Sequence, residues 1–287
     1  MGKISQKSIC KTQNRNHQFF GWKLLTVLTL FIISGLLVIL TNFHTYAKEP
    51  NPQPPSLLGK GAKISPILVG EGLGERSRQK PHPLPLSLEK WQDQNNSGDY
   101  FDHIQPTQVG YLIWSHFPIK VNIETPTNIN QQQAQTWVNQ VSQAIKEWNN
   151  FLPLELVENS EIADIKADIQ PDIKILRQRP PLQIDPISKT PRARSALTTY
   201  ELYNQNNFLL HRFTILLSPS QTGEHLQAAA RHEMGHALGI WGHSPLKTDA
   251  LYFSQVRKPA SISSRDVNTL KKIYQQSTSL GWSSVKN

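Results

Sequence analysis

Apolar and polar positions alternate along a short stretch that begins at Phe117. In FPIKVNIETP the apolar residues fall on one side of an extended chain, which predicts a half-buried strand that ends at Pro126. The next segment repeats apolar residues at steps of three and four, which predicts an amphipathic helix with Asn130 as its N-cap. The apolar positions of that helix are Ala134, Trp137, Val138, Val141, Ile145 and Trp148.

Similar patterns continue to the end of the chain. LPLELVE, ADIKADIQ, TTYELY and FLLHRFTILLS have strand character, whereas residues 177–195 form a polar, proline-broken stretch typical of a loop. A helix is predicted through EHLQAAARHEMGHAL after Gly223, and a last helix from Ser263, which forms a capping-box pattern with Asp266. This order predicts an α+β domain of the α/β type, with a twisted mixed sheet, two long helices and a C-terminal helix.

The N-terminal region differs in composition from the rest. Residues 24–41 form an uncharged apolar run, long enough for a membrane-spanning helix. Residues 1–23 are basic, which predicts a cytoplasmic N-terminus and an extracytoplasmic location for the chain beyond the apolar run. We favour a single-pass anchor; the alternative is a secretory signal that is cleaved to release a secreted protein. Residues 42–105 are rich in proline and glycine and are expected to form a linker or a pro-segment, ahead of a folded domain at 106–287.

Charge is distributed according to this division of the chain. The net charge is +9, yet from Trp91 onward the chain holds 18 basic and 17 acidic residues. A nucleic-acid-binding domain needs a large basic face, so we exclude nucleic acid as a partner. Cys10 is the only cysteine, which excludes an intrachain disulfide and a cysteine-based metal site.

The stretch HEMGHALGIWGHS contains the candidate metal-binding and catalytic residues. His232 and His236 are one helical turn apart, so both imidazoles project from one face and can reach a single zinc ion. Glu233 is placed to take a proton from a metal-bound water and to pass it to a leaving amine. Gly239 can end the helix in a left-handed conformation, which directs a third ligand, His243, back toward the metal.

This stretch resembles the metzincin signature HExxHxxGxxH, and it is particularly similar to the matrixins, the matrix-metalloproteinase-like peptidases. The resemblance covers about residues 110–276 and includes DALYF, ADI, FTILLS and ISSRDVNTLKKIYQ. It implies zinc ligation by His232, His236 and His243, with Glu233 as the general base. It also implies a matrixin-like catalytic domain that acts on protein or peptide substrates.

Two positions depart from the family pattern. The family places its third ligand at the position of Gly242, which has no side chain, and we expect the flexible turn to absorb one extra residue so that His243 takes that role. The methionine of the family's Met-turn falls at Leu251, where leucine has a similar volume and can form the same apolar floor.

We therefore interpret the chain as a membrane-anchored zinc endopeptidase with one catalytic Zn²⁺ ion; structural calcium stays open. An extended substrate is expected to pair along the strand near Phe208–Leu217. The main alternative is a catalytically silent, membrane-tethered peptide-binding module. A scaffold protein with a chance HExxH motif and a zinc hydrolase with a non-peptide substrate are the others.

Overall fold

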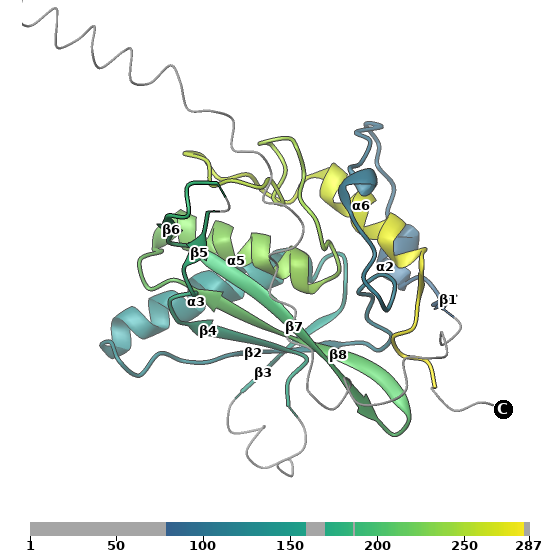
Figure 1. The fold of residues 1–287 in the computed structure, drawn as a ribbon, viewed down its shortest axis with the longest axis horizontal. Coiled ribbons are helices and arrows are strands. Elements are labelled where there is room, and N and C mark those ends of the chain that lie inside the picture. The colour runs from purple at the N-terminus through teal and green to yellow at the C-terminus, as the bar shows by residue number, and fades with distance from the viewer. Residues whose placement is uncertain (1–78, 159–169, 186, 284–287) are drawn as a thin grey trace, which may run out of the picture. The chain divides into compact units, whose positions relative to one another are not determined.

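The domain is built on a five-stranded mixed sheet (Figure 1). The computed structural model describes residues 79–158, 170–185 and 187–283. The strands lie in the order β3-β2-β4-β8-β7; the first four run parallel to one another, and β7 runs antiparallel to β8. Their bounds are Ile119–Ile123 for β2, Leu154–Val157 for β3, Ile173–Arg177 for β4, Ala196–Gln205 for β7 and Phe208–Leu217 for β8.

Two long helices pack on the sheet and on each other. Helix α3, Gln131–Trp148, lies against β2 and β3, and helix α5, Gly223–Ala237, lies against β7 and β8 (Figure 1). Asn130 is the N-cap of α3, as predicted, and its side chain accepts a hydrogen bond from the Gln133 amide at 2.9 Å. These two helices and the mixed sheet confirm the predicted α+β class.

The C-terminal helix also begins where the sequence predicts. Helix α6, Ser264–Tyr274, has Ser263 as its N-cap, and Asp266 completes the capping box. The shorter elements are β1 (Lys80–Pro81), paired with β9 (Ser277–Thr278), β5 (Gln183–Ile184), paired with β6 (Pro191–Arg192), α2 (Leu86–Lys90) and the 3₁₀ helix η3 (Phe101–His103).

Residues 79–105, assigned from composition to the linker, pack on the domain. Leu88, Tyr100 and Ile104 are at most 3% exposed, and the Tyr100 hydroxyl donates to the Asp266 carboxylate at 2.6 Å. Proline-rich sequence lacks helical or strand periodicity, yet single apolar side chains within it can still enter a core. The described part of the domain thus starts ahead of residue 106.

The other N-terminal expectations lie outside the described residues. These are the cytoplasmic segment 1–23, the anchor 24–41 and the linker up to residue 78. Within the described part of the chain, no helix combines the length and apolar character needed to cross a membrane.

Strand β4 lies where no strand was predicted. It comes shortly after ADIKADIQ, most of which lies in residues 159–169, outside the described ranges. Ile173 and Ile175 of β4 are fully buried between β2 and β8. The predicted loop at 177–195 contains the short β5–β6 pair.

One buried histidine lies on β8, outside the sequence motif. His211 is 3% exposed, and its ring stacks on Trp114 with 4.2 Å between ring centroids. Its Nε2 atom has no hydrogen-bond partner among the described residues. Burial, with a smaller contribution from His116, lowers the pKa of His211 to about 3.

This histidine predicts acid sensitivity of the fold. The unfolded chain takes up a proton near the ordinary histidine pKa of about 6.5, but the folded chain does not, so stability falls as the pH drops through that value. Between pH 7.5 and pH 5 the wild type is expected to lose about 2 kcal/mol more unfolding free energy than His211→Leu. Urea denaturation of both proteins with a chelator present measures this difference, and identical pH dependence would contradict the account.

Candidate metal centre

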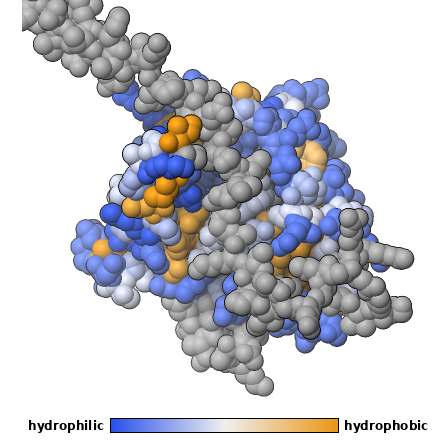
Figure 2. All heavy atoms as spheres, in the orientation of Figure 1, coloured by the Kyte–Doolittle hydropathy of each residue, from blue (hydrophilic) through white to orange (hydrophobic). Residues whose placement is uncertain are grey.

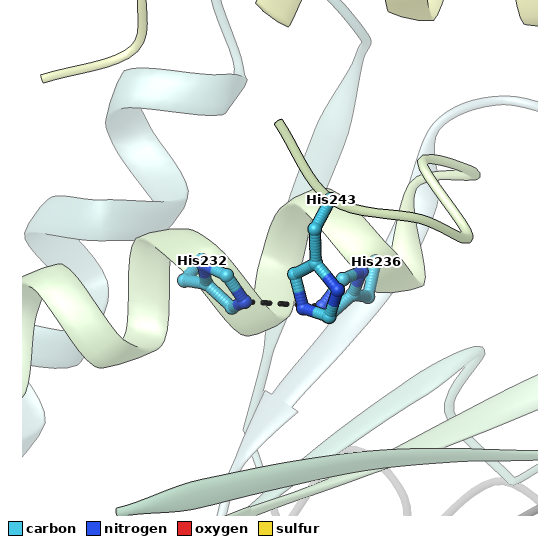
Figure 3. A group of neighbouring side chains, drawn as sticks. All are labelled: His232, His236 and His243. Atoms are coloured by element: carbon cyan, nitrogen blue, oxygen red, sulfur yellow. Dashed lines mark hydrogen bonds between the residues drawn. The ribbon is translucent and has the colours of Figure 1, made fainter. Parts of the chain in front are cut away.

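Three imidazoles converge at the C-terminal half of α5 (Figure 3). His232 and His236 project from successive turns of the helix, and His243 reaches them from the loop that follows. One ligand atom from each lies within 4.8 Å of the others. The ring centroids are separated by 4.7 Å for 232–236, 4.9 Å for 236–243 and 5.3 Å for 232–243. The structure thus brings together all three predicted ligands, including the displaced third one.

Backbone carbonyls orient the two helical histidines. His232 Nδ1 lies 2.9 Å from the Ala250 carbonyl oxygen, and His236 Nδ1 lies 2.7 Å from that of Ile240. A carbonyl can only accept, so each Nδ1 carries the proton and each Nε2 presents a lone pair. The two Nε2 atoms face each other at 3.1 Å (Figure 3). Two lone pairs at this distance repel unless a cation or a proton lies between them.

The donor set fits a divalent ion such as zinc. Neutral imidazole is a preferred zinc ligand, and two nitrogens at tetrahedral angles and bond lengths of about 2.0–2.1 Å lie roughly 3.3 Å apart. The observed 3.1 Å between the Nε2 atoms is close to that separation. The cluster among the described residues holds three histidines. Three protein ligands would leave a fourth position open, as in catalytic rather than structural zinc sites.

A Schellman turn ends α5 and starts the loop to His243. The Gly239 amide donates to the His236 carbonyl at 3.1 Å, and the Ile240 amide donates to the Gly235 carbonyl at 3.0 Å. Gly239 has a φ of +123°, which a residue with a side chain rarely adopts. The turn places the Ile240 carbonyl next to the His236 ring. The same turn therefore ends the helix and orients the His236 imidazole.

Two aromatic side chains donate hydrogen bonds to the next two carbonyls at the C-terminal end of α5. Trp114 Nε1 donates to the Ala237 carbonyl at 2.9 Å, and the Tyr274 hydroxyl donates to the Leu238 carbonyl at 3.0 Å. The last carbonyls of a helix lack partners within it, and both are buried here. These bonds therefore stabilise the end of α5 that carries His236.

The space around Gly242 leaves no room for a side chain at that position. A Cβ atom at this position would lie 2.5 Å from the His103 carbonyl oxygen and from Ile104 Cδ1. Ile104 also forms an isolated antiparallel bridge with Gly242. The segment after η3 thus occupies the place that a side chain at 242 would need, whereas the His243 ring lies next to those of His232 and His236.

The turn around Leu251 lies against the same helix. Leu251 is fully buried, and a Cβ atom at Gly235 would come within 2.6 Å of its Cδ2 atom. The preceding residue, Ala250, supplies the carbonyl that accepts from His232. Leucine thus provides the apolar packing expected of this position, while the backbone of the turn orients the His232 ring.

Glu233 points toward the edge of the sheet. The residue is 8% exposed, and its carboxylate accepts a hydrogen bond from the Thr198 hydroxyl of β7 at 2.6 Å. Thr198 is not among the residues predicted for the site, because a threonine in TTYELY is an ordinary strand residue. Only the pairing of β7 with β8 beneath α5 reveals the contact.

The expected substrate strand needs a correction. We expected an added strand along Phe208–Leu217, but β8 pairs with β7 along its whole length and with β4 over Phe213–Leu217. The Leu209 backbone is also hydrogen-bonded to Gly281 and Trp282, so most of the other side of β8 is occupied. Among the described residues, the strand with an open edge near Glu233 is β7, Ala196–Gln205.

Comparison with known proteins adds no family assignment. No protein-family model matches the chain, and no curated protein matches it at a significant level.

Moving the third histidine tests the steric argument at Gly242. His243→Ala should weaken zinc binding by at least about 100-fold, because it removes a direct ligand. Gly242→His combined with His243→Ala restores the spacing of the family signature, yet it should not restore affinity because the new Cβ collides with the backbone at His103. Competition with a chelating dye measures both affinities.

The single variant adds no atoms, so it reports ligand loss without crowding. Wild-type zinc affinity in the double variant would show that position 242 can carry the ligand and would contradict the structure.

Proposed function

We propose that the protein is a zinc-dependent endopeptidase of metzincin, matrixin-like type. The observation that supports this most is the convergence of His232, His236 and His243 beside Glu233, which follows His232 on the same helix. A metal-ligand cluster with an adjacent buried carboxylate is the arrangement that hydrolytic metal sites use.

Each side chain has a distinct role in the proposed reaction. The three imidazoles would hold the ion through nitrogen, and two of them are already oriented by Ala250 and Ile240. Zinc bound there would polarise the scissile carbonyl and lower the pKa of a bound water toward about 7. Glu233 accepts a proton from the attacking water and returns it to the leaving amine. Thr198 holds the Glu233 carboxylate in place during both transfers.

The edge of β7 suits an extended polypeptide. An edge strand offers unpaired N–H and C=O groups, and a peptide can add to it as a further strand. Thr198 belongs to β7 and contacts Glu233, so a peptide paired along this edge would pass close to the base. This geometry favours peptides over small-molecule substrates.

A silent peptide-binding module remains the second candidate. The observation that favours it is the same open edge of β7, which can bind a peptide without any hydrolysis. In either case we propose that residues 24–41 anchor the protein in a membrane, with the domain on the extracytoplasmic side; signal cleavage would instead release it.

Removing the proposed base separates these candidates. Glu233→Ala in the full chain should reduce cleavage of an unfolded protein by at least about 100-fold, because the proton acceptor is lost. Zinc content should stay at one ion per chain, since Glu233 is not a ligand. Glu224→Ala is the matched control, because Glu224 is an exposed glutamate of the same helix. Cleavage by Glu233→Ala at the wild-type rate would contradict the proposed role.

The hydrogen bond from β7 to the base gives an independent test. Thr198→Val keeps the side-chain shape but removes the hydroxyl, and the loss of a bond to a charged group should lower kcat/KM by about 10- to 100-fold. Thr198→Ser retains a hydroxyl and should recover most of the activity. Steady-state kinetics on a quenched peptide measure both; equal activity of the valine and serine variants would exclude a positioning role.

A further inference from the structure

The β5–β6 hairpin exposes a cluster of aliphatic side chains. Leu182, Ile184 and Ile187 are 56%, 57% and 88% exposed. Single exposed apolar residues are ordinary on a protein surface, but three within six residues form a patch. Figure 2 shows hydrophobic side chains at the surface in the region of β5 and β6, bordered by hydrophilic ones. We refer to residues 177–194 as the hairpin segment.

The hairpin segment also concentrates positive charge. It contains five basic residues and one acidic residue, whereas the rest of the chain from Trp91 onward holds 13 basic and 16 acidic residues. Arg192 pairs with Asp185 at 3.1 Å, while Arg179 and Lys189 are exposed. Although the net charge of the domain is near neutral, the hairpin segment is basic. The same segment contains the exposed aliphatic cluster.

Hydrogen bonds fix the shape of the hairpin tip. The Asp185 carboxylate accepts from the Ile187 amide at 3.0 Å and from the Ser188 amide at 2.8 Å. The backbone of Asp185 also exchanges bonds with Thr190 and Lys189, each at 2.9 Å. Ile187 is therefore exposed while its amide is hydrogen-bonded to the Asp185 carboxylate.

We propose that the hairpin segment inserts into the surface of an anionic lipid bilayer. Leu182, Ile184 and Ile187 enter the boundary between headgroups and acyl chains, and Arg179 and Lys189 meet lipid phosphates. Aliphatic residues flanked by cations are the combination that interfacial membrane binding uses. A protein surface that binds nucleic acid would instead offer aromatic side chains for base stacking, and the hairpin segment contains none.

This contact is separate from the anchor expected at 24–41 and from the proposed hydrolysis. It involves neither the histidine cluster nor Glu233. A test of the membrane contact is therefore independent of the peptidase assignment.

Fluorescence quenching in nanodiscs tests the insertion directly. The full chain with Cys10→Ser and Ile187→Cys is labelled with an environment-sensitive dye and reconstituted with phosphatidylcholine alone or with added phosphatidylserine. We expect a blue-shifted emission and quenching by spin-labelled lipid, both stronger with phosphatidylserine. Gln205→Cys provides the control label, because Gln205 is exposed at the opposite end of β7 from the hairpin segment. That label should stay unquenched.

Two variants separate the apolar and the charged contributions. Leu182→Ser with Ile184→Ser should abolish quenching at position 187, and Arg179→Gln with Lys189→Gln should remove the response to phosphatidylserine. Unchanged unfolding midpoints control for folding, since all four positions are exposed or at the surface. Quenching at 187 no greater than at 205 overturns the proposal. So does a label that responds to a DNA duplex or to an unfolded protein but not to lipid.

Discussion

The site depends on the orientation of two imidazole rings by backbone carbonyls. Ala250 and Ile240 each accept from an Nδ1 atom, and this directs the Nε2 lone pairs of His232 and His236 toward one point. A histidine on a solvated helix can rotate and exchange tautomers, whereas these two rings are held in one state. The geometry of this candidate metal centre thus depends on where α5 ends and on the turn that brings Ala250 back to the His232 ring.

A single buried carboxylate, that of Asp266, connects the turn at Ala250 to distant parts of the chain. Asp266 is fully buried and accepts from the Ala250 amide at 2.9 Å, from the Ser263 amide at 2.8 Å and from the Tyr100 hydroxyl at 2.6 Å. Burial and the nearby Asp266 charge raise the pKa of Tyr100 well above its ordinary value, so the phenol remains a donor. Asp266, which completes the capping box of α6, therefore also holds the turn that orients His232.

The sequence was most informative where periodicity determines geometry. The step of four residues places His232 and His236 on one helix face, and the caps at Asn130 and Ser263 are local patterns that the structure confirms. Contacts distant in sequence could not be predicted this way. Neither the Thr198–Glu233 bond nor the packing of Ile104 against Gly242 leaves a pattern in the chain. The open edge of β7 has the same origin, because only the pairing of β8 with β4 and β7 determines which strand lies at the edge of the sheet.

X-ray absorption at the zinc edge of the purified full chain reports whether the three histidines hold the ion. We expect one zinc per chain, with three imidazole nitrogens at about 2.0–2.1 Å and one oxygen ligand. The imidazole count should fall to two in His243→Ala. Purified protein without zinc, or with an imidazole count that the His243 substitution leaves unchanged, would contradict this expectation.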